Sequence, residues 1–161
     1  FEGKEVGVFL CNSGDYVEVY INGAFKGKFD TDIYGGKLNR EGYISVAKKL
    51  TDKFGFKGVA ITLRESKSAS DNDWSGMLYT GGEAYFSKKY SMHIVDRVGG
   101  GDSFGAGLIY SITNGYDAQS TIEFAVAASC LKHTIEGDYN MVSVAEAKNL
   151  AGGDASGRVQ R

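Results

Sequence analysis

Three consecutive glycines followed by an aspartate, Gly99 to Asp102, are the residues of this chain whose types and spacing could do chemistry. Glycine has no Cβ, so backbone N–H groups can approach a ligand closely here and the chain can adopt a positive φ. An apolar helical pattern follows directly, and the amino terminus of a helix attracts anions such as phosphate. A carboxylate beside an anion site would repel the ligand unless it had a task, such as that of a general base next to a phosphoryl group. The alternative is structural, because aspartate is also a common N-cap in glycine-rich turns between a strand and a helix.

The longer stretch from Asp96 to Ile109, DRVGGGDSFGAGLI, resembles the second signature of the ribokinase-like (PfkB) carbohydrate kinases. In that signature an acidic residue precedes a run of small residues ending in Gly-Asp, then three further residues, then a small residue, a glycine and two apolar residues. Arg97 departs from the general pattern, which has a small or β-branched residue at that position. The segments ITLRES (61–66), NDWSGMLY (72–79) and LKHTIEGDYNMVSVAEAKNL (131–150), with the terminal SGRVQR, are similar to the carboxyl-terminal half of bacterial 2-keto-3-deoxygluconate kinases.

The resemblance runs from about residue 33 to the end of the chain and implies a fold and a reaction. The implied fold is a ribokinase-like, Rossmann-like layered α/β domain, here a partial one. The implied reaction is transfer of the γ-phosphoryl group of ATP to the terminal hydroxyl of a keto-deoxy sugar acid. In that reaction Asp102 accepts the proton of the attacking hydroxyl, while the backbone N–H groups of Gly99, Gly100 and Gly101 stabilise the phosphoryl oxygens and Mg²⁺ bridges the phosphates.

A second set of residues is expected to bind the nucleotide, together with Gly99 and Gly101. Arg64 follows an apolar run, at the carboxyl edge where α/β sheets bind ligands, and its guanidinium could clamp a phosphate. Its alternative is an ion pair with Glu65 or another surface carboxylate. The resemblance adds Ser129 and His133, because the helical segment that holds them lines the adenine pocket in ribokinase-like folds. From composition alone, a packed or surface role for His133 is favoured.

The elements that position these residues begin with β-type sequence. Strands are expected over residues 6–10, 16–21 and 24–29, and Asn22-Gly23 between the last two is typical of a type I′ hairpin turn. Residues 1–32 match no part of the family, so we treat them as a β segment of unassigned origin: a lid-like sheet, an extension or engineered sequence. Residues 33–161 form the ribokinase-like ATP-binding and catalytic portion.

From Asn39 onward the apolar period becomes helical, with Asn39 as the expected N-cap and Gly55 as the stop. The apolar run 58–63 is expected to form a buried parallel strand. Gly81-Gly82 predicts a second hairpin between residues 76–80 and 84–87. A further strand is expected over residues 92–95.

Three helices are expected to complete the domain. The first runs from Asp102 to residue 114 and is closed by Gly115, and the second runs from an Asp117 cap to about residue 134. Ser143 and Glu146 have the spacing of a capping box at the start of the last helix, which ends near residues 152–153.

Composition and missing motifs exclude several classes of protein. The chain of 161 residues is 42% apolar and 24% charged, and its net charge of −2 argues against binding to nucleic acid. It has no apolar run near the roughly 20 residues of a membrane span and no signal peptide, and its two distant cysteines fit a cytoplasmic protein without a zinc or disulfide site. Walker A, dinucleotide and HExxH patterns are absent. Asp71 and Asp73 could suggest metal binding, but the run SKSASDND is better explained as a flexible polar loop.

The expected partners are therefore a small sugar acid and a nucleotide, and the sequence leaves open whether the chain forms a homo-oligomer. Ribokinase-like kinases are longer, and their first glycine-rich signature, sugar contacts and Asn-x-x-Glu motif do not appear in this sequence. We therefore expect weak nucleotide binding and slow or no turnover by this chain. The alternatives are a non-catalytic nucleotide-binding module, a half-protein that needs complementation, and a plain α/β scaffold with a β-hairpin interaction surface.

Overall fold

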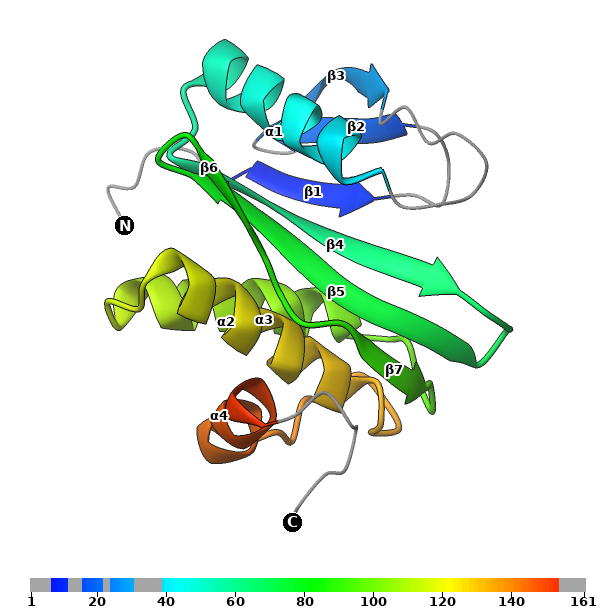
Figure 1. Ribbon diagram of the computed structural model, residues 1–161. Coiled ribbons are helices and arrows are strands. Elements are labelled where there is room, and N and C mark those ends of the chain that lie inside the picture. The colour runs from blue at the N-terminus through cyan, green and yellow to red at the C-terminus, as the bar shows by residue number, and fades with distance from the viewer. Residues whose placement is uncertain (1–6, 12–15, 22–23, 31–38, 154–161) are drawn as a thin grey trace. The chain divides into compact units, whose positions relative to one another are not determined.

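The computed structural model describes residues 7–11, 16–21, 24–30 and 39–153, with side chains for residues 39–153 (Figure 1). The chain divides into two compact units. The first comprises residues 1–61 and 79–83, and the second comprises residues 62–78 and 84–161. None of the helices in the described ranges combines the length and the apolarity that crossing a bilayer requires.

In the first unit, three strands form an antiparallel sheet in the order β1-β2-β3: β1 (Gly7–Cys11), β2 (Tyr16–Ile21) and β3 (Ala24–Asp30). The three strands predicted from the alternating sequence are confirmed. Ile21 pairs with Ala24, as a two-residue hairpin requires, although the Asn22-Gly23 turn itself lies outside the described residues. The assignment of residues 1–32 as a separate segment stays a prediction.

Helix α1 (Arg40–Phe54) has the two ends that the sequence predicts. The Asn39 side chain accepts a hydrogen bond from the Gly42 N–H, and Gly55 adopts a φ of 68° while its N–H donates to the Thr51 carbonyl at 2.8 Å. These are local cap bonds that satisfy backbone groups left unpaired at the helix ends.

A second sheet is built around β5 (Asp71–Thr80). It pairs with β4 (Gly58–Ser66) and β6 (Glu83–Phe86), and with β7 (Tyr90–His93). Gly81 and Gly82 have φ values of 61° and 87°, so the predicted hairpin between β5 and β6 is confirmed. The chain leaves β7 at His93, earlier than expected, because the N–H groups of Val95 and Asp96 donate to the His133 carbonyl instead of to a strand.

Two expectations about this sheet are wrong. Only residues 67–70 connect β4 to β5, whereas parallel neighbours need a crossover of a dozen residues or more, so β4 is one arm of an antiparallel hairpin. The polar run SKSASDND is not a loop throughout, since β5 begins at Asp71. Asp73 is only 7% exposed there and forms an ion pair with Lys67 at 2.6 Å, which lets a polar sequence enter a sheet.

Helices α2 (Gly100–Thr113), α3 (Ala118–Lys132) and α4 (Val144–Gly152) pack beside the part of this sheet that belongs to the second unit (Figure 1). Glycines let the layers approach closely: a Cβ at Gly76 would lie 2.7 Å from Val126 Cγ2, and one at Gly107 would lie 2.8 Å from Ala125 Cα. The Asp117 cap and the capping box of Ser143 and Glu146 are both confirmed. The second unit is thus an α/β layer with α3 at its centre.

Candidate functional site

The glycine turn, residues 99–101, begins α2 in a way that the sequence only partly predicts. Gly99 is the N-cap, with a φ of 77° and no side-chain cap bond, and Asp102 lies in the first turn of the helix. The alternative that Asp102 is an N-cap is therefore wrong. Because Gly99 adopts the positive φ, the helix starts two residues earlier than expected.

Two backbone donors at the start of α2 have no acceptor in the part of the chain that the structure describes. The Gly100 N–H donates to the Arg97 carbonyl at 3.3 Å, and the Ser103 N–H donates to the Gly99 carbonyl at 2.9 Å. Within the described residues, the N–H groups of Gly101 and Asp102 have no acceptor. A Cβ at Gly101 would have no atom within 4 Å, and the Asp102 side chain is exposed, so the donors lie at an open surface. Unpaired donors at the positive end of a helix suit an anion.

The predicted backbone donors differ in their hydrogen bonds. The Gly100 N–H is occupied within the turn, whereas the Gly101 N–H has no acceptor among the described residues. Contact of Gly99 and Gly101 with a phosphate stays a prediction. The N–H of Asp102 is a further donor that the sequence pattern did not predict. Its position could be expected, because the first turn of any helix leaves N–H groups without an intrahelical acceptor.

Ser129 and His133 support the glycine turn from the interior. The Ser129 hydroxyl donates to the Gly100 carbonyl at 2.8 Å, and the His133 Nδ1–H donates to the Ser129 carbonyl at 2.7 Å. Ser129 is 0% exposed and His133 is 4% exposed, and the His133 ring lies 4.8 Å from the ring of Trp74. The packed role of His133 is confirmed, and direct nucleotide contact by Ser129 and His133 stays a prediction.

The burial of His133 predicts a pH dependence of stability. Desolvation, with smaller contributions from the charges of Lys132, Arg97 and Arg64, holds the pKa of His133 below its ordinary value of 6.5. Between the two pKa values the unfolded chain binds a proton that the folded chain excludes, so stability rises with pH. The His133 contribution is complete above pH 6.5 and is lost as pH falls through the folded pKa. Urea unfolding of wild type between about pH 7.5 and 5, compared with His133→Phe, should show a steeper loss in wild type.

The exposed His93 is left unchanged in both proteins, because its Nδ1 is hydrogen bonded to Asp71 and lowers the pKa of that carboxyl. Equal slopes for wild type and His133→Phe would contradict the assignment of the slope to His133.

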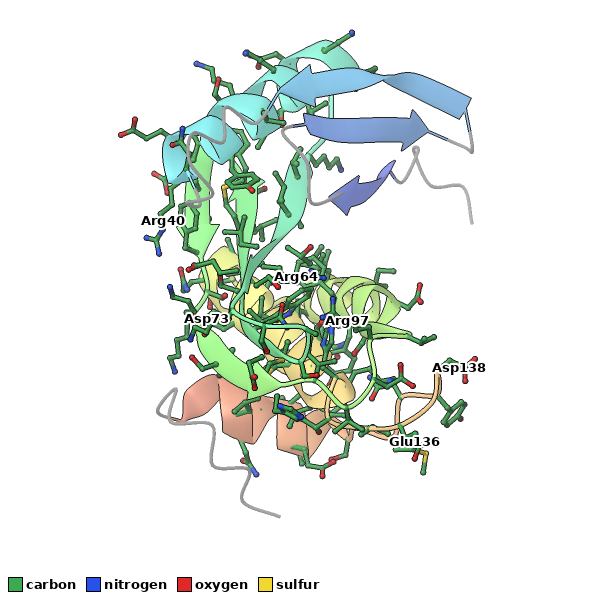
Figure 2. All side chains as sticks on the ribbon, turned by 90° about the vertical axis from the view of Figure 1, so that its right-hand side faces the viewer. Arg40, Arg64, Asp73, Arg97, Glu136 and Asp138 are labelled. Atoms are coloured by element: carbon green, nitrogen blue, oxygen red, sulfur yellow. The ribbon has the colours of Figure 1, made fainter. Side chains whose placement is uncertain are left out.

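Arg64 and Arg97 place two positive charges close enough to His133 to act on its pKa. Glu65 is paired with Lys89 at 3.0 Å, and no described carboxylate pairs with Arg64, so the alternative of an Arg64–Glu65 ion pair is wrong. Arg97 donates from Nη2 to the Ala69 carbonyl. Figure 2 shows the two side chains near each other, Arg64 coming from β4 and Arg97 from the segment before α2. Partial burial and the charge of Arg97 lower the pKa of Arg64, as expected for neighbouring cations without an anion.

The acidic residue of the signature, Asp96, has a structural task. Its two oxygens accept hydrogen bonds from the Val98 N–H at 3.0 Å and the Gly137 N–H at 2.9 Å, and these bonds lower its pKa. Asp96 therefore joins the segment before α2 to the loop after α3.

The described residues hold no group of three or more metal-ligating side chains. Asp71 is hydrogen bonded to His93 and Asp73 is paired with Lys67, so neither carboxylate is directed to a metal. The N–H groups at the start of α2 therefore suit an anion better than a protein-bound cation. A magnesium ion accompanying a nucleotide would be held mainly by phosphate oxygens and water.

Comparisons with known proteins identify relatives of this chain. Residues 37–145 match the profile of the pfkB family carbohydrate kinases. A crystal structure of 2-dehydro-3-deoxygluconokinase from Thermotoga maritima is 54% identical, with a TM-score of 0.70 over 71% of this chain and 35% of that one. A PfkB family carbohydrate kinase from Listeria grayi is 33% identical, with a TM-score of 0.64 over 74% of this chain and 36% of that one.

A curated relative, 2-dehydro-3-deoxygalactonokinase from Haloferax volcanii, is 27% identical over 69% of this chain and 33% of its own length. The chain thus spans about a third of the length of the relatives that it matches. The resemblance found in the sequence and the expected ribokinase-like fold are confirmed.

Proposed function

The chain belongs to the pfkB family of carbohydrate kinases, and from this premise we propose that it takes part in transfer of the γ-phosphoryl group of ATP to a hydroxyl group of a 2-keto-3-deoxy sugar acid. The sugar-acid class is supported by the likeness to a 2-dehydro-3-deoxygluconokinase and a 2-dehydro-3-deoxygalactonokinase. The observation that carries the proposal is the pair of N–H groups at Gly101 and Asp102, which no described residue accepts from, beside the exposed Asp102 carboxylate.

Each group has one task in the proposed reaction. The Asp102 carboxylate accepts the proton of the sugar hydroxyl as its oxygen forms a bond to the γ-phosphorus, and the bond from that phosphorus to the β-phosphate oxygen breaks to release ADP. The N–H groups of Gly101 and Asp102 donate to the phosphoryl oxygens, whose charge is stabilised most strongly by donors fixed in advance. Magnesium bound with the nucleotide would neutralise phosphate charge.

Ser129 and His133 have a supporting task in this proposal. Because Ser129 is bonded to the Gly100 carbonyl and His133 lies against Gly100, they fix the turn that aims the donors. The predicted cytoplasmic location fits a reaction between small polar metabolites and remains a prediction.

Arg64 is proposed to bind the nucleotide phosphates, because it lacks a described carboxylate partner. A guanidinium bonded to phosphate typically contributes about 1.5–3 kcal/mol, so Arg64→Ala should weaken ATP binding roughly tenfold or more. Lys89→Ala is the matched control, since it removes the same charge from a lysine already paired with Glu65. Calorimetric titration with ATP should distinguish them, and equal affinities for the two variants would remove Arg64 from the phosphate site.

The reaction itself is tested with the unmodified chain, ATP and each of the two epimers, 2-keto-3-deoxygluconate and 2-keto-3-deoxygalactonate. An excess of protein over labelled ATP allows even slow phosphoryl transfer to be detected. Sugar-dependent ADP formation would support the kinase. ATP binding without transfer would favour the second candidate, a non-catalytic module or a half-protein that needs complementation, which is consistent with a match that covers only 35% of the relative. Absence of ATP binding would contradict both.

A further inference from the structure

Lys132, the last residue of α3, is a buried lysine with no carboxylate at ion-pair distance among the described residues. The residue is 0% exposed, and its Nζ donates to the carbonyl oxygens of Gly137 at 2.6 Å and Ile135 at 3.2 Å. No described carboxylate oxygen lies within 4.0 Å of it. Removing a cation from water is costly, and two carbonyl groups offset only part of that cost. The folded chain therefore keeps a positive charge at a place where its burial costs free energy.

That place is directly behind the glycine turn. A Cβ at Gly99 would lie 3.3 Å from Lys132 Cε and 2.6 Å from the Asp138 carbonyl oxygen, so the lysine stem and its loop pack against the N-cap of α2. The charge of Lys132 also contributes to lowering the pKa of His133, which contacts Gly100. The electric field of Lys132 therefore acts on a residue that supports the glycine turn.

We propose that Lys132 is a buried electrostatic component of the anion site, a positive charge behind the glycine turn that stabilises the negative charge bound in front of it. The inference rests on the proposed function for the identity of the anion, the phosphate chain of a nucleotide. It adds a positioning residue that has no contact with the ligand.

The surrounding charges favour a net attraction for an anion. Arg64 and Arg97 are the other cations that act on His133. Of the carboxylates, Asp96 lies near enough for the charge of Lys132 to help lower its pKa, and its oxygens also accept from the N–H groups of Val98 and Gly137. Asp102 is exposed to water. A charge enclosed in protein is screened less by water and salt than an exposed one, so Lys132 acts more strongly than a surface lysine at the same distance.

A purely structural role is the alternative, in which Lys132 only ties residues 135–137 to α3. The two roles predict different dependences on ligand charge. Loss of a tether would weaken all ligands of the site alike, whereas loss of a charge would weaken a ligand in proportion to its own charge.

The experiment compares wild type with Lys132→Gln, which keeps a hydrogen-bond donor but removes the charge, and with Lys132→Arg, which keeps the charge. Adenosine, AMP, ADP and ATP are titrated by calorimetry, with fluorescence of Trp74, the single tryptophan, as a second signal. For Lys132→Gln we expect ATP affinity to fall about tenfold, ADP and AMP affinity to fall progressively less, and adenosine affinity to stay unchanged. Lys132→Arg should retain the preference for ATP over AMP. The exposed Lys89 gives the control Lys89→Gln, whose effect should be small and should vanish at high salt.

Outcomes for the inference and for the proposed function are distinguishable. Equal losses for adenosine and ATP, or no loss for ATP, in Lys132→Gln would overturn the inference and leave the kinase proposal standing. Failure of wild type to bind ATP would overturn the kinase proposal and the inference with it. If Lys132→Gln does not fold, Lys132→Arg decides: a retained preference for ATP over AMP supports the electrostatic role, and loss of that preference overturns it.

Discussion

Replacing Asp102 with asparagine is expected to abolish phosphoryl transfer while nucleotide binding stays intact or becomes stronger. Asparagine keeps the size of the side chain but cannot accept a proton from the sugar hydroxyl, and a general base typically contributes 10²–10⁴-fold to a rate. Removing a negative charge beside an anion site should at the same time favour ATP binding. Stability should change little, because Gly99 rather than Asp102 caps α2 and the Asp102 side chain is exposed.

Transfer is measured with excess protein over labelled ATP and with 2-keto-3-deoxygluconate as acceptor. Glu136→Gln is the control, since it removes an equal charge from an exposed carboxylate on the loop after α3 (Figure 2). A rate for Asp102→Asn equal to that of Glu136→Gln would remove Asp102 from the mechanism. Lower ATP affinity in Asp102→Asn would show that the carboxylate supports the site rather than opposing the anion.

A methyl group at Gly100 is expected to destabilise the fold, whereas the same methyl group at Gly101 is not. A Cβ at Gly100 would lie 2.6 Å from His133 Nε2 and closer still to Cε1, and the imidazole cannot move away easily because Nδ1 is bonded to the Ser129 carbonyl. Such overpacking costs typically 1–3 kcal/mol and occasionally more, so we expect about 3 kcal/mol for Gly100→Ala. A Cβ at Gly101 meets no atom within 4 Å, and alanine in a helix is favoured over glycine by about 0.5–1 kcal/mol.

Urea unfolding of the two variants measures this difference directly. Similar free energies of unfolding for Gly100→Ala and Gly101→Ala would contradict the packing of His133 under Gly100. A combined variant, Gly100→Ala with His133→Ala, should recover part of the loss if the clash is its cause. From the sequence alone, Gly100 looked like a ligand-facing residue, but its described contacts are with the interior.

The helix ends were predictable because their signals are local. Asn39, Asp117 and Ser143 each cap a helix by a hydrogen bond to an N–H three residues away, so a few neighbouring letters are enough to predict them. The partner of β4 was not predictable in the same way. The apolar run 58–63 fits a parallel or an antiparallel strand, and the choice depends on the ion pair and hydrogen bond that draw Asp73 into β5.

The residues of the candidate site also divide into those with a local sequence signal and those that depend on distant contacts. Asp102 and Gly101 are found by a contiguous signature, and the structure keeps both at an open surface. Lys132 carried no signal, because a lysine in the last turn of a helix is ordinary in any sequence. Its burial depends on carbonyl groups of residues 135 and 137 and on a glycine that is 33 positions earlier. Contacts of that kind emerge only once α2 and α3 are packed together.

The order of α2, α3 and α4 has a consequence for how the chain reaches its native state. The three helices are consecutive, and each packs on the next. Where α2 turns into α3, the ring of Tyr110 stacks on that of Phe124, and the ring of Tyr116 meets both edge to face. Contacts between neighbours in sequence require little loop closure and form quickly, whereas strand pairing between distant segments is slow. The glycine turn and Asp102 therefore belong to the segment that can fold early, as a local nucleus on which the sheet condenses.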